Sequence, residues 1–232
     1  MKTYTMKTMS LLVALLALAF AGCSRSESPG GKPTLVGSWI VPADKRQQEG
    51  LFDGAITTFE KDGTATRTVY RGSDAGKTFS GKWKVSGDKY IAEHKDANGK
   101  TVTNEFRIVA LTETSFAYEY KYDPAVVSPG GPTSGVVNMM RVGKVGGGLT
   151  MDGAYKGSSS DTGDLVFQPN GLAYEPKDGK IPSTGFIWAW QISGNTLRMM
   201  NHRRETGGTI ESHTPEALRT VNKHERLDFF KK

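Results

Sequence analysis

The sequence predicts an all-β protein built from two tandem antiparallel units, each a meander or a small barrel, with a short helix near the C-terminus. Three observations support this fold class: short runs that alternate between polar and apolar residues, glycine-containing turn pairs between the runs, and two motifs that recur about 107 residues later. Glycine contributes 28 of the 232 residues, which is above the usual share and favours turns and strands over long helices. The single cysteine excludes a disulfide framework and a multi-cysteine metal site.

The N-terminus has the pattern of an export signal. Lys2 and Lys7 precede an unbroken apolar run at residues 11–21, and small residues follow it. As a helix this run would rise only about 16 Å, which is about half of a ~30 Å hydrocarbon core. We therefore predict that residues 1–22 are a removable signal peptide. No second apolar stretch in the sequence is long enough to span a bilayer as a helix.

The only cysteine stands directly after this signal. The motif Phe20-Ala21-Gly22-Cys23 resembles the lipobox of bacterial lipoproteins. The resemblance implies cleavage before Cys23 and lipidation of Cys23 with a diacylglycerol and an amino-terminal acyl chain such as palmitate. It also implies anchoring in the outer membrane, because Ser24 rather than Asp follows the cysteine. The alternative is plain secretion after the A-x-A site at residues 19–21, which would leave Cys23 as a free thiol.

The rest of the chain divides at stretches that cannot pack. Residues 24–34 contain no large apolar side chain, so we expect 23–34 to be a flexible tether. Three consecutive glycines at residues 146–148 then separate a first unit at 35–145 from a second unit at 149–232. We expect the two units to fold as separable domains, and the larger first unit to be stable alone.

Eight sequential strands are expected in the first unit. In residues 79–85 and 116–122, aromatic or apolar residues alternate with polar ones, as in a strand with one buried face. Eight strands with short turns suit an up-and-down barrel or a pair of packed meanders. The expected strands are residues 35–41, 54–60, 64–71, 78–86, 89–95, 101–110, 114–122 and 136–143, and the connection at 123–134, rich in proline and glycine, is not expected to be a strand.

Two motifs recur at nearly equal spacing. The F-x-x-D-G motif at residues 59–63 returns as F-x-x-N-G at 167–171, and the W-x-V-S-G-D motif at 83–88 returns as W-x-I-S-G-N at 190–195. Gly37-Ser38-Trp39 also has a partner in Gly153-Ala154-Tyr155. We interpret these as two repeated units. The alternative is that both motifs are common hairpin solutions without shared ancestry.

The same segments carry a family resemblance. On the opening G-x-W at residues 37–39, the hairpin at 56–64 and the Gly81-Lys82-Trp83 segment followed by Gly87-Asp88, residues 35–144 resemble the lipocalin-like domains of bacterial lipoproteins. Residues 150–232 resemble them more loosely. The resemblance implies a small antiparallel barrel rather than an activity, and it implies that Arg141 lies over the ring of Trp39.

The second unit departs from this pattern in two places. Tyr155 stands where the first unit has Trp39. Thr214-Pro215-Glu216 predicts the start of a short helix, because threonine is a good N-cap and proline suits the first helical position. Whether the second unit closes as a barrel is left open by the sequence.

We find no recognised catalytic or metal-binding motif. His202, His213 and His224 are spaced by eleven residues, which fits no usual metal-ligand pattern, and no phosphate-binding loop, dinucleotide fingerprint or nucleophile elbow is present. Lys and Arg outnumber Asp and Glu by only 30 to 24, so nucleic acid is not an expected partner. We therefore predict a protein that is not an enzyme and uses no metal or cofactor.

Aromatic stripes are the best indication of a binding site. Several of these residues are tyrosines, and a buried hydroxyl costs free energy unless it is hydrogen-bonded, so the stripes favour a cavity with polar groups among apolar walls. The alternative is that the rings fill two small cores, because an eight-stranded barrel is just wide enough to be filled by side chains. The predicted ligand-binding residues are Phe79, Trp83, Phe106, Phe116, Tyr118, Tyr120, Trp188 and Trp190.

Two function hypotheses follow from different classes. The first is a non-catalytic binding module, held on the membrane by its N-terminal lipid, for a lipid or another small apolar ligand. The second is a structural or interaction lipoprotein with filled cores, which binds an envelope protein or inhibits an enzyme through its outer face. Cavity volume separates them: a connected, aromatic-lined pocket of ~300 Å³ or more favours binding, and two filled cores favour interaction.

Overall fold

The computed structural model describes residues 34–42, 54–70, 74–96, 98–121, 133–146, 149–158, 163–177, 180–181, 187–201, 205–222 and 226–232. In these residues all the regular secondary structure is β-strand, and no helix is found. The predicted signal peptide at 1–22, Cys23 and residues 24–33 of the predicted tether lie outside the described residues. The contacts of Pro33–Lys232 form one compact unit of their own.

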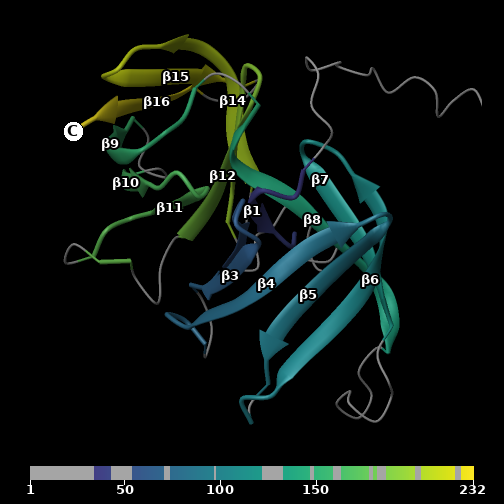
Figure 1. The fold of residues 1–232 in the computed structure, drawn as a ribbon. Coiled ribbons are helices and arrows are strands. Elements are labelled where there is room, and N and C mark those ends of the chain that lie inside the picture. Colours follow the sequence, from purple (N-terminus) through teal and green to yellow (C-terminus); the bar gives the residue numbers. More distant parts are fainter. Residues whose placement is uncertain are drawn as a thin grey trace, which may run out of the picture. The chain divides into compact units, whose positions relative to one another are not determined.

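The first eight strands close into an antiparallel barrel, which we call the first ring (Figure 1). Each strand pairs with its neighbours along the chain, and β1 also pairs with β8, so the sheet closes on itself. The strands are β1 (Gly37–Ile40), β2 (Ala55–Phe59), β3 (Thr64–Val69), β4 (Thr78–Ser86), β5 (Lys89–Lys95), β6 (Thr101–Leu111), β7 (Ser115–Lys121) and β8 (Ser134–Val145).

The strands expected in the first unit are confirmed. Alternation locates them because one face of each strand turns to the barrel interior, where Phe59, Tyr90 and Phe116 are buried. The strand ends differ from the expected ones by a few residues. The difference that changes an expectation is at β8, which begins at Ser134, within the connection that was predicted to be irregular.

The remaining eight strands also pair in a closed order, which we call the second ring. Each is antiparallel to its neighbours, and β9 bonds to β16 while β12 bonds to β13. The strands are β9 (Gly153–Gly157), β10 (Asp164–Phe167), β11 (Leu172–Tyr174), β12 (Ile187–Ser193), β13 (Thr196–Met200), β14 (Glu205–His213), β15 (Ala217–Val221) and β16 (Arg226–Lys231).

The predicted short helix near the C-terminus is wrong. Residues 214–216 form the turn of the β14–β15 hairpin, in which the backbone N–H of Thr214 donates to the carbonyl of Ala217 at 2.8 Å. The hydroxyl of Thr214 accepts hydrogen bonds from the N–H groups of Glu216 and Ala217. A helix N-cap begins with similar bonds, which is why the residues are ambiguous. The chain continues as a strand because β15 pairs with both β14 and β16.

The recurring tryptophan motifs have the same hydrogen bonds. The indole N–H of Trp83 donates to the carbonyl of Glu60 at 3.1 Å, and that of Trp190 donates to the carbonyl of Gln168 at 3.0 Å. The backbone N–H of each tryptophan also donates to the glycine that ends the F-x-x-D/N-G motif, at 2.7 Å in both cases. The two hairpins therefore match in structure as well as in sequence.

A second structural match between the two rings lies outside the repeated sequence motifs. The register of β6 on β7 shifts after Ile108, and the register of β14 on β15 shifts after Ile210. In each ring the turn that follows begins with a threonine, Thr112 or Thr214, whose hydroxyl accepts from backbone N–H groups. A bulge and a turn therefore recur at corresponding places in the two rings.

A buried apolar cluster joins the two rings. The end of β8 pairs in parallel with β12, with Gly143 opposite Gln191, and the side-chain amide of Gln191 donates to the carbonyl of Arg141 at 2.6 Å. The glycines at 147 and 148 lie outside the described residues, and separable folding of the two units stays a prediction. The buried members of the cluster are Ile40, Ile56, Val142, Leu172, Tyr174, Ile187, Ala189 and Met200.

Candidate ligand cavity

One end of the first ring is closed by Trp39 and Arg141. Trp39 is fully buried, and the Cζ atom of Arg141 lies 4.3 Å from the centre of its ring. Burial lowers the pKa of Arg141 from its usual value, although the nearby Glu113 carboxylate opposes this. The predicted contact between Trp39 and Arg141 is confirmed. The guanidinium also donates hydrogen bonds to the carbonyls of Thr34, Val36 and Glu113.

The second ring has a related arrangement at its own closing strands. Lys231 of β16 is the register partner of Tyr155 in β9, as Arg141 is of Trp39.

In the first ring, Gly37 has a φ of +129°, and a Cβ atom there would meet the Arg141 guanidinium. The glycine of the G-x-W motif therefore lets the arginine reach the tryptophan.

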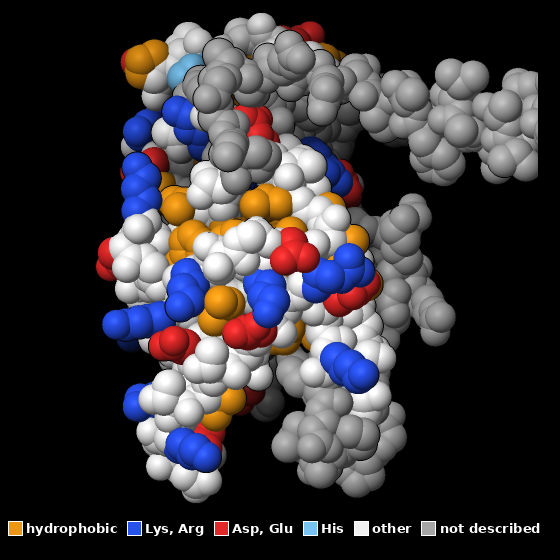
Figure 2. Space-filling model, turned by 45° about the vertical axis from the view of Figure 1, so that its right-hand side comes forward, with side chains coloured by type: hydrophobic (Ala, Val, Ile, Leu, Met, Phe, Trp, Pro, Cys, Tyr) orange, Lys and Arg blue, Asp and Glu red, His pale blue; other side chains and the backbone are white. Residues whose placement is uncertain are grey.

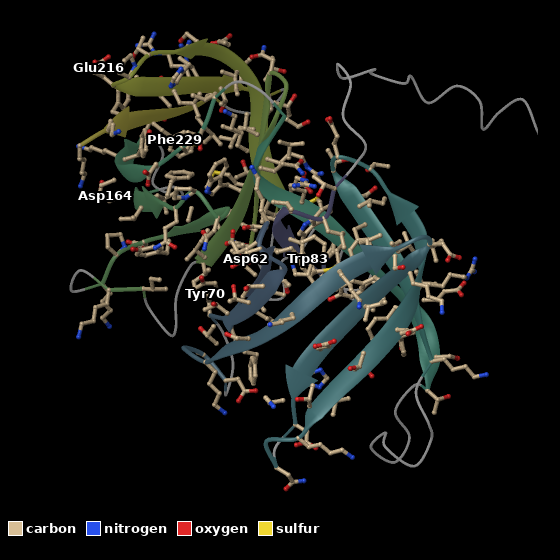
Figure 3. All side chains as sticks on the ribbon, in the orientation of Figure 1. Asp62, Tyr70, Trp83, Asp164, Glu216 and Phe229 are labelled. Carbon is tan, nitrogen blue, oxygen red and sulfur yellow. The ribbon has the colours of Figure 1, made fainter. Side chains whose placement is uncertain are left out.

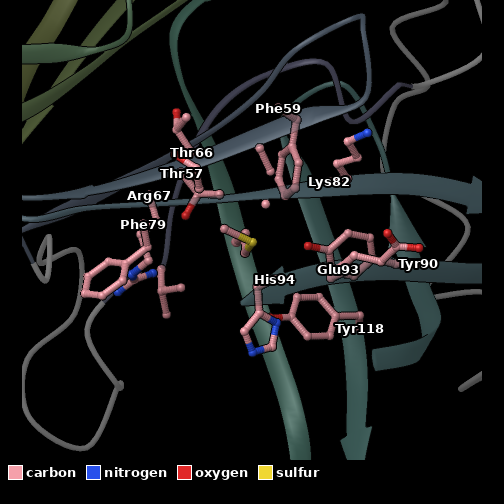
Figure 4. A pocket seen from close by; sticks show the side chains of 16 residues that line it. Thr57, Phe59, Thr66, Arg67, Phe79, Lys82, Tyr90, Glu93, His94 and Tyr118 are labelled. Carbon is pink, nitrogen blue, oxygen red and sulfur yellow. The ribbon is translucent and has the colours of Figure 1, made fainter. Parts of the chain in front are cut away.

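The interior of the first ring is hollow beyond this closed end. A cavity of about 240 Å³ opens between β2, β3, β4, β5, β7 and β8 (Figure 4). Its apolar wall consists of Phe59, Tyr90, Met139 and the half-buried Tyr118. Phe79, which is 52% exposed, lies at the solvent side of this space. The volume is below the ~300 Å³ that we expected of a ligand-binding pocket, and only one of the two cores is filled, so the cavity meets neither expectation in full.

Polar groups share the cavity with these rings. Arg67 is the register partner of Phe79, and His94 is the register partner of Gly81. Figure 4 shows the imidazole of His94 beside the ring of Tyr118, and Arg67 beside Phe79. Along each strand, residues that face the barrel interior alternate with residues that face outward. Among the lining residues, 67, 79, 81 and 94 face the interior, and 66, 80, 82 and 93 face outward.

Two small residues create the hollow. Gly81 stands two residues before Trp83, and Ala92 is the register partner of Trp83. At the corresponding places of the second ring, two residues before Trp190 and opposite it, stand Trp188 and Met199. Both of these are fully buried in the core of the second ring. The first ring therefore has open space where the second has an indole and a thioether.

Gly81 is constrained by more than size. A Cβ atom at this position would collide with the backbone carbonyl of Glu93 in the neighbouring strand. A larger residue would therefore have to move β4 relative to β5 before its side chain could enter the cavity. Ala92 has no such backbone restriction and is the simpler position at which to fill the space.

The second ring is filled. Its buried core holds the aromatic residues Tyr155, Phe167, Trp188, Trp190 and Phe229 together with aliphatic side chains from all the other strands of the ring. Phe167 makes edge contacts with three of them, at ring-centre distances between 5.4 and 6.2 Å. Figure 3 shows the side chains crowded around Phe229. The filled-core alternative thus describes the second ring.

The predicted ligand-binding residues separate into four groups. Phe79 and Tyr118 line the cavity. Phe106, Phe116 and the half-buried Trp83 belong to the core cluster of the first ring and are not among the cavity-lining residues. Trp188 and Trp190 lie in the core of the second ring and do not reach the cavity lining. Tyr120 contacts the first-ring cluster but lines a different hollow.

That second hollow is an open groove of about 470 Å³ on β6, β7 and β8. Its wall includes the exposed ion pair between Arg107 and Glu119, with 2.7 Å between nitrogen and oxygen. A second exposed pair, Lys89 with Glu105, lies on the neighbouring strands. Figure 2 shows acidic and basic side chains interspersed on the visible face. Exposed pairs of this kind are typical of a solvated strand face.

Several cavity residues were missed by reasoning from the sequence. Thr57, Phe59, Arg67, Tyr90, His94 and Met139 all line the space. Aromatic stripes direct attention to rings and away from the small residues that leave room. Aligning the two repeats would have indicated the cavity, because Gly81 and Ala92 are aligned with the much larger Trp188 and Met199.

Other site types receive no support from the described part of the chain. No group of three or more His, Cys, Asp or Glu side chains there is placed to hold a metal ion. No helix among the described residues is long and apolar enough to cross a membrane. No family model matches the chain, and neither a curated protein nor a solved structure matches it.

Proposed function

We propose that the protein is a non-catalytic lipoprotein of the bacterial outer membrane, in which the first ring is a lipocalin-like binding module for a small apolar ligand. The observation that carries this proposal is the contrast between the two rings: one is hollow at Gly81 and Ala92, and the other is filled by Trp188 and Met199. An interior that is lined by aromatic rings and a few polar groups is typical of small-molecule sites.

The proposal includes two tandem units that arose by duplication. Matching tryptophan hydrogen bonds, matching bulges in β6 and β14, and matching threonine turns support it. Common hairpin solutions account for one such match more easily than for all of them. In this interpretation the second unit kept the strand order and lost the interior space.

The volume favours a small ligand over a lipid. At about 240 Å³ the cavity would hold about eight water molecules at ~30 Å³ each. An acyl chain of a membrane lipid would not fit inside along its whole length. We therefore narrow the proposed ligand to a molecule of about eight to ten non-hydrogen atoms.

The second ring favours the other function hypothesis, interaction with a partner protein through its outer face. Its interior is filled, so any partner would have to contact its outer face. The buried cluster that joins the rings gives the second ring a supporting role for β1 and β8, because Ile40 and Val142 pack against Leu172 and Ile187. Interaction with an envelope protein remains the second candidate function for this ring.

The anchor is tested by Cys23→Ala. We expect the full-length variant to leave the membrane fraction, because lipidation of this residue is the proposed attachment. Fractionation followed by a high-salt wash measures the change, and Ser24→Ala is the matched control that should still sediment with membranes. A Cys23→Ala protein that remains with membranes after the wash would show that the anchor lies elsewhere.

The binding function is tested by Ala92→Met, which gives the first ring the residue that fills the second. The chain from Ser24 to Lys232 is suitable, because Pro33–Lys232 form a compact unit of their own. We expect calorimetry to show one saturable site for 4-methylphenol, and binding about tenfold weaker or worse in the variant. The melting temperature should not fall, since methionine fills existing space.

Ile91→Met is the matched control, because residue 91 lies on the opposite face of β5. It should bind 4-methylphenol as the unaltered chain does. The proposed function would be wrong if the unaltered chain bound no small aromatic probe, or if Ala92→Met left the affinity unchanged.

A further inference from the structure

We infer that Phe79 limits the ligand of the first ring to a compact molecule, about the size of one substituted ring, by obstructing the open end of the cavity. The inference rests on the proposed function, because it names the ligand class and a specificity-determining residue for the same cavity. Three features of the first ring support it: the direction in which the cavity opens, the closure of its other sides, and the position of Phe79.

The burial of the inward-facing residues decreases along β4 and β5 toward one end of the cavity. On β4, Gly81 is half-buried and Phe79 is exposed. On β5, Tyr90 is buried, Ala92 is half-buried and His94 is exposed. Phe79 and His94 therefore lie where the cavity opens to solvent.

The opposite side of the cavity is occupied by side chains. Phe59 and Met139 line the space and are buried. The buried ring of Tyr90 lies 5.5 Å from the ring of Phe116, which lies 6.0 Å from the ring of Trp39, measured between ring centres. Contacting rings thus connect the lining to the closed end of the first ring. A longer ligand would have to displace them in order to extend in this direction.

Paired strands close the sides of the cavity next to Phe79. Residues 64–68 of β3 pair with residues 78–82 of β4 without a break in register. Residues 81–86 of β4 pair in the same way with residues 89–94 of β5. A ligand cannot pass between strands that are joined by backbone hydrogen bonds. The part of a long ligand that does not fit inside would therefore have to leave through the open end.

Phe79 stands at this open end on the inward-facing side of β4. Its side chain is 52% exposed, and among the described lining residues it is the one large apolar side chain that is exposed. Figure 4 shows its ring on the other side of the space from Tyr90. A compact ligand can lie between these two rings, whereas a longer one would collide with Phe79. Such a collision is a physical source of specificity, because it weakens binding of the longer molecule alone.

The test compares 4-methylphenol with 4-pentylphenol, which has the same ring and four more methylenes, on the chain from Ser24 to Lys232. If the cavity accommodated the whole alkyl chain, four buried methylenes would tighten binding by about a hundredfold or more. We expect calorimetry to show that 4-pentylphenol binds the unaltered chain at most about threefold more tightly than 4-methylphenol.

Phe79→Ala should tighten binding of 4-pentylphenol by about tenfold or more, because removal of the ring leaves room for the alkyl chain at the open end. Binding of 4-methylphenol should change by less than about threefold. Phe79→Leu keeps apolar bulk at the same position and should give a smaller gain. Val109→Ala is the matched control, since Val109 is an exposed apolar residue of the first ring outside the cavity lining, and it should change neither affinity. Melting temperatures confirm that each variant is folded.

The possible failures are distinguishable. If 4-pentylphenol bound the unaltered chain about tenfold or more tightly than 4-methylphenol, there would be no limit on ligand length. If Phe79→Ala left the affinity for 4-pentylphenol unchanged or weakened it, Phe79 would not be the obstruction. Both results would overturn the inference and leave the binding function standing, because 4-methylphenol would still bind. If neither phenol binds the unaltered chain, the proposed function itself is wrong.

Discussion

Trp188→Ala should lower the free energy of unfolding by about 3–5 kcal/mol, as expected for removal of a large buried side chain. Trp188 is 1% exposed and packs with Met199, Trp190 and Phe229 in the buried core of the second ring. Its removal would leave a space that the surrounding strands of a closed sheet cannot collapse to fill. Urea unfolding of the chain from Ser24 to Lys232 measures the loss.

Trp83→Ala is the comparison within the same chain. Trp83 carries the same indole hydrogen bond as Trp190, but it is half-buried and lies in the ring that already contains a cavity. We expect its removal to cost about half as much, since fewer contacts are lost. Equal losses for Trp188→Ala and Trp83→Ala would contradict the distinction between a filled and a hollow ring.

Arg141→Met should lower the free energy of unfolding by about 3 kcal/mol. The substitution keeps much of the apolar stem and removes the donor of three backbone carbonyls, as well as the cation over Trp39. Because the arginine ties β8 to the residues before β1, its loss weakens the closure of the first ring. Thermal and urea unfolding both report this change.

A double-mutant cycle separates the cation–ring contact from the rest. Trp39→Phe and Arg141→Lys should be non-additive, because each removes a partner of the same contact, worth about 0.5–2 kcal/mol. The pair Trp39→Phe with Arg107→Met is the control and should be additive, since Arg107 lies on the exposed face with Glu119. Additive losses within ~0.3 kcal/mol for Trp39 and Arg141 would show that the contact contributes nothing.

Strand positions could be predicted because they depend on local information. In 79–85 and 116–121 every second residue turns inward, and glycine turn pairs mark the ends of the hairpins. The contact of Arg141 with Trp39 followed from resemblance rather than from pattern. The helix at Thr214 was wrong because the same threonine and proline open a hairpin turn, and the partners that decide the matter, β14 and β16, come from elsewhere in the chain.

The cavity could be predicted only in part. Aromatic stripes identified Phe79 and Tyr118, but an aromatic ring in a strand can fill a core as readily as line a space, as Trp188 and Trp190 do. What makes the space is the absence of side-chain volume at Gly81 and Ala92, and that becomes visible only when the closed sheet shows which residues share the interior. The inward direction of Arg67 likewise depends on the register of β3 with β4.

The sequence alone did not identify the joint between the rings. Ile187 to Ile192 are buried on both faces of β12, because one face turns into the second ring and the other meets the first. A continuous apolar run of this kind predicts a strand covered on both sides, yet it does not say what covers it. The parallel pairing of β8 with β12 links residues about fifty positions apart.

A crystal structure with a bound probe tests most directly whether the first ring is hollow and the second ring is filled. The chain from Ser24 to Lys232 is crystallised with 4-bromophenol, a neutral molecule whose bromine is located by anomalous scattering. We expect one bromine peak per chain inside the first ring, among Phe59, Tyr90 and Met139, and no peak inside the second ring. Crystals of Ala92→Met should lose that peak. No bromine in the first ring of the unaltered chain, or a bromine inside the second, would contradict the account.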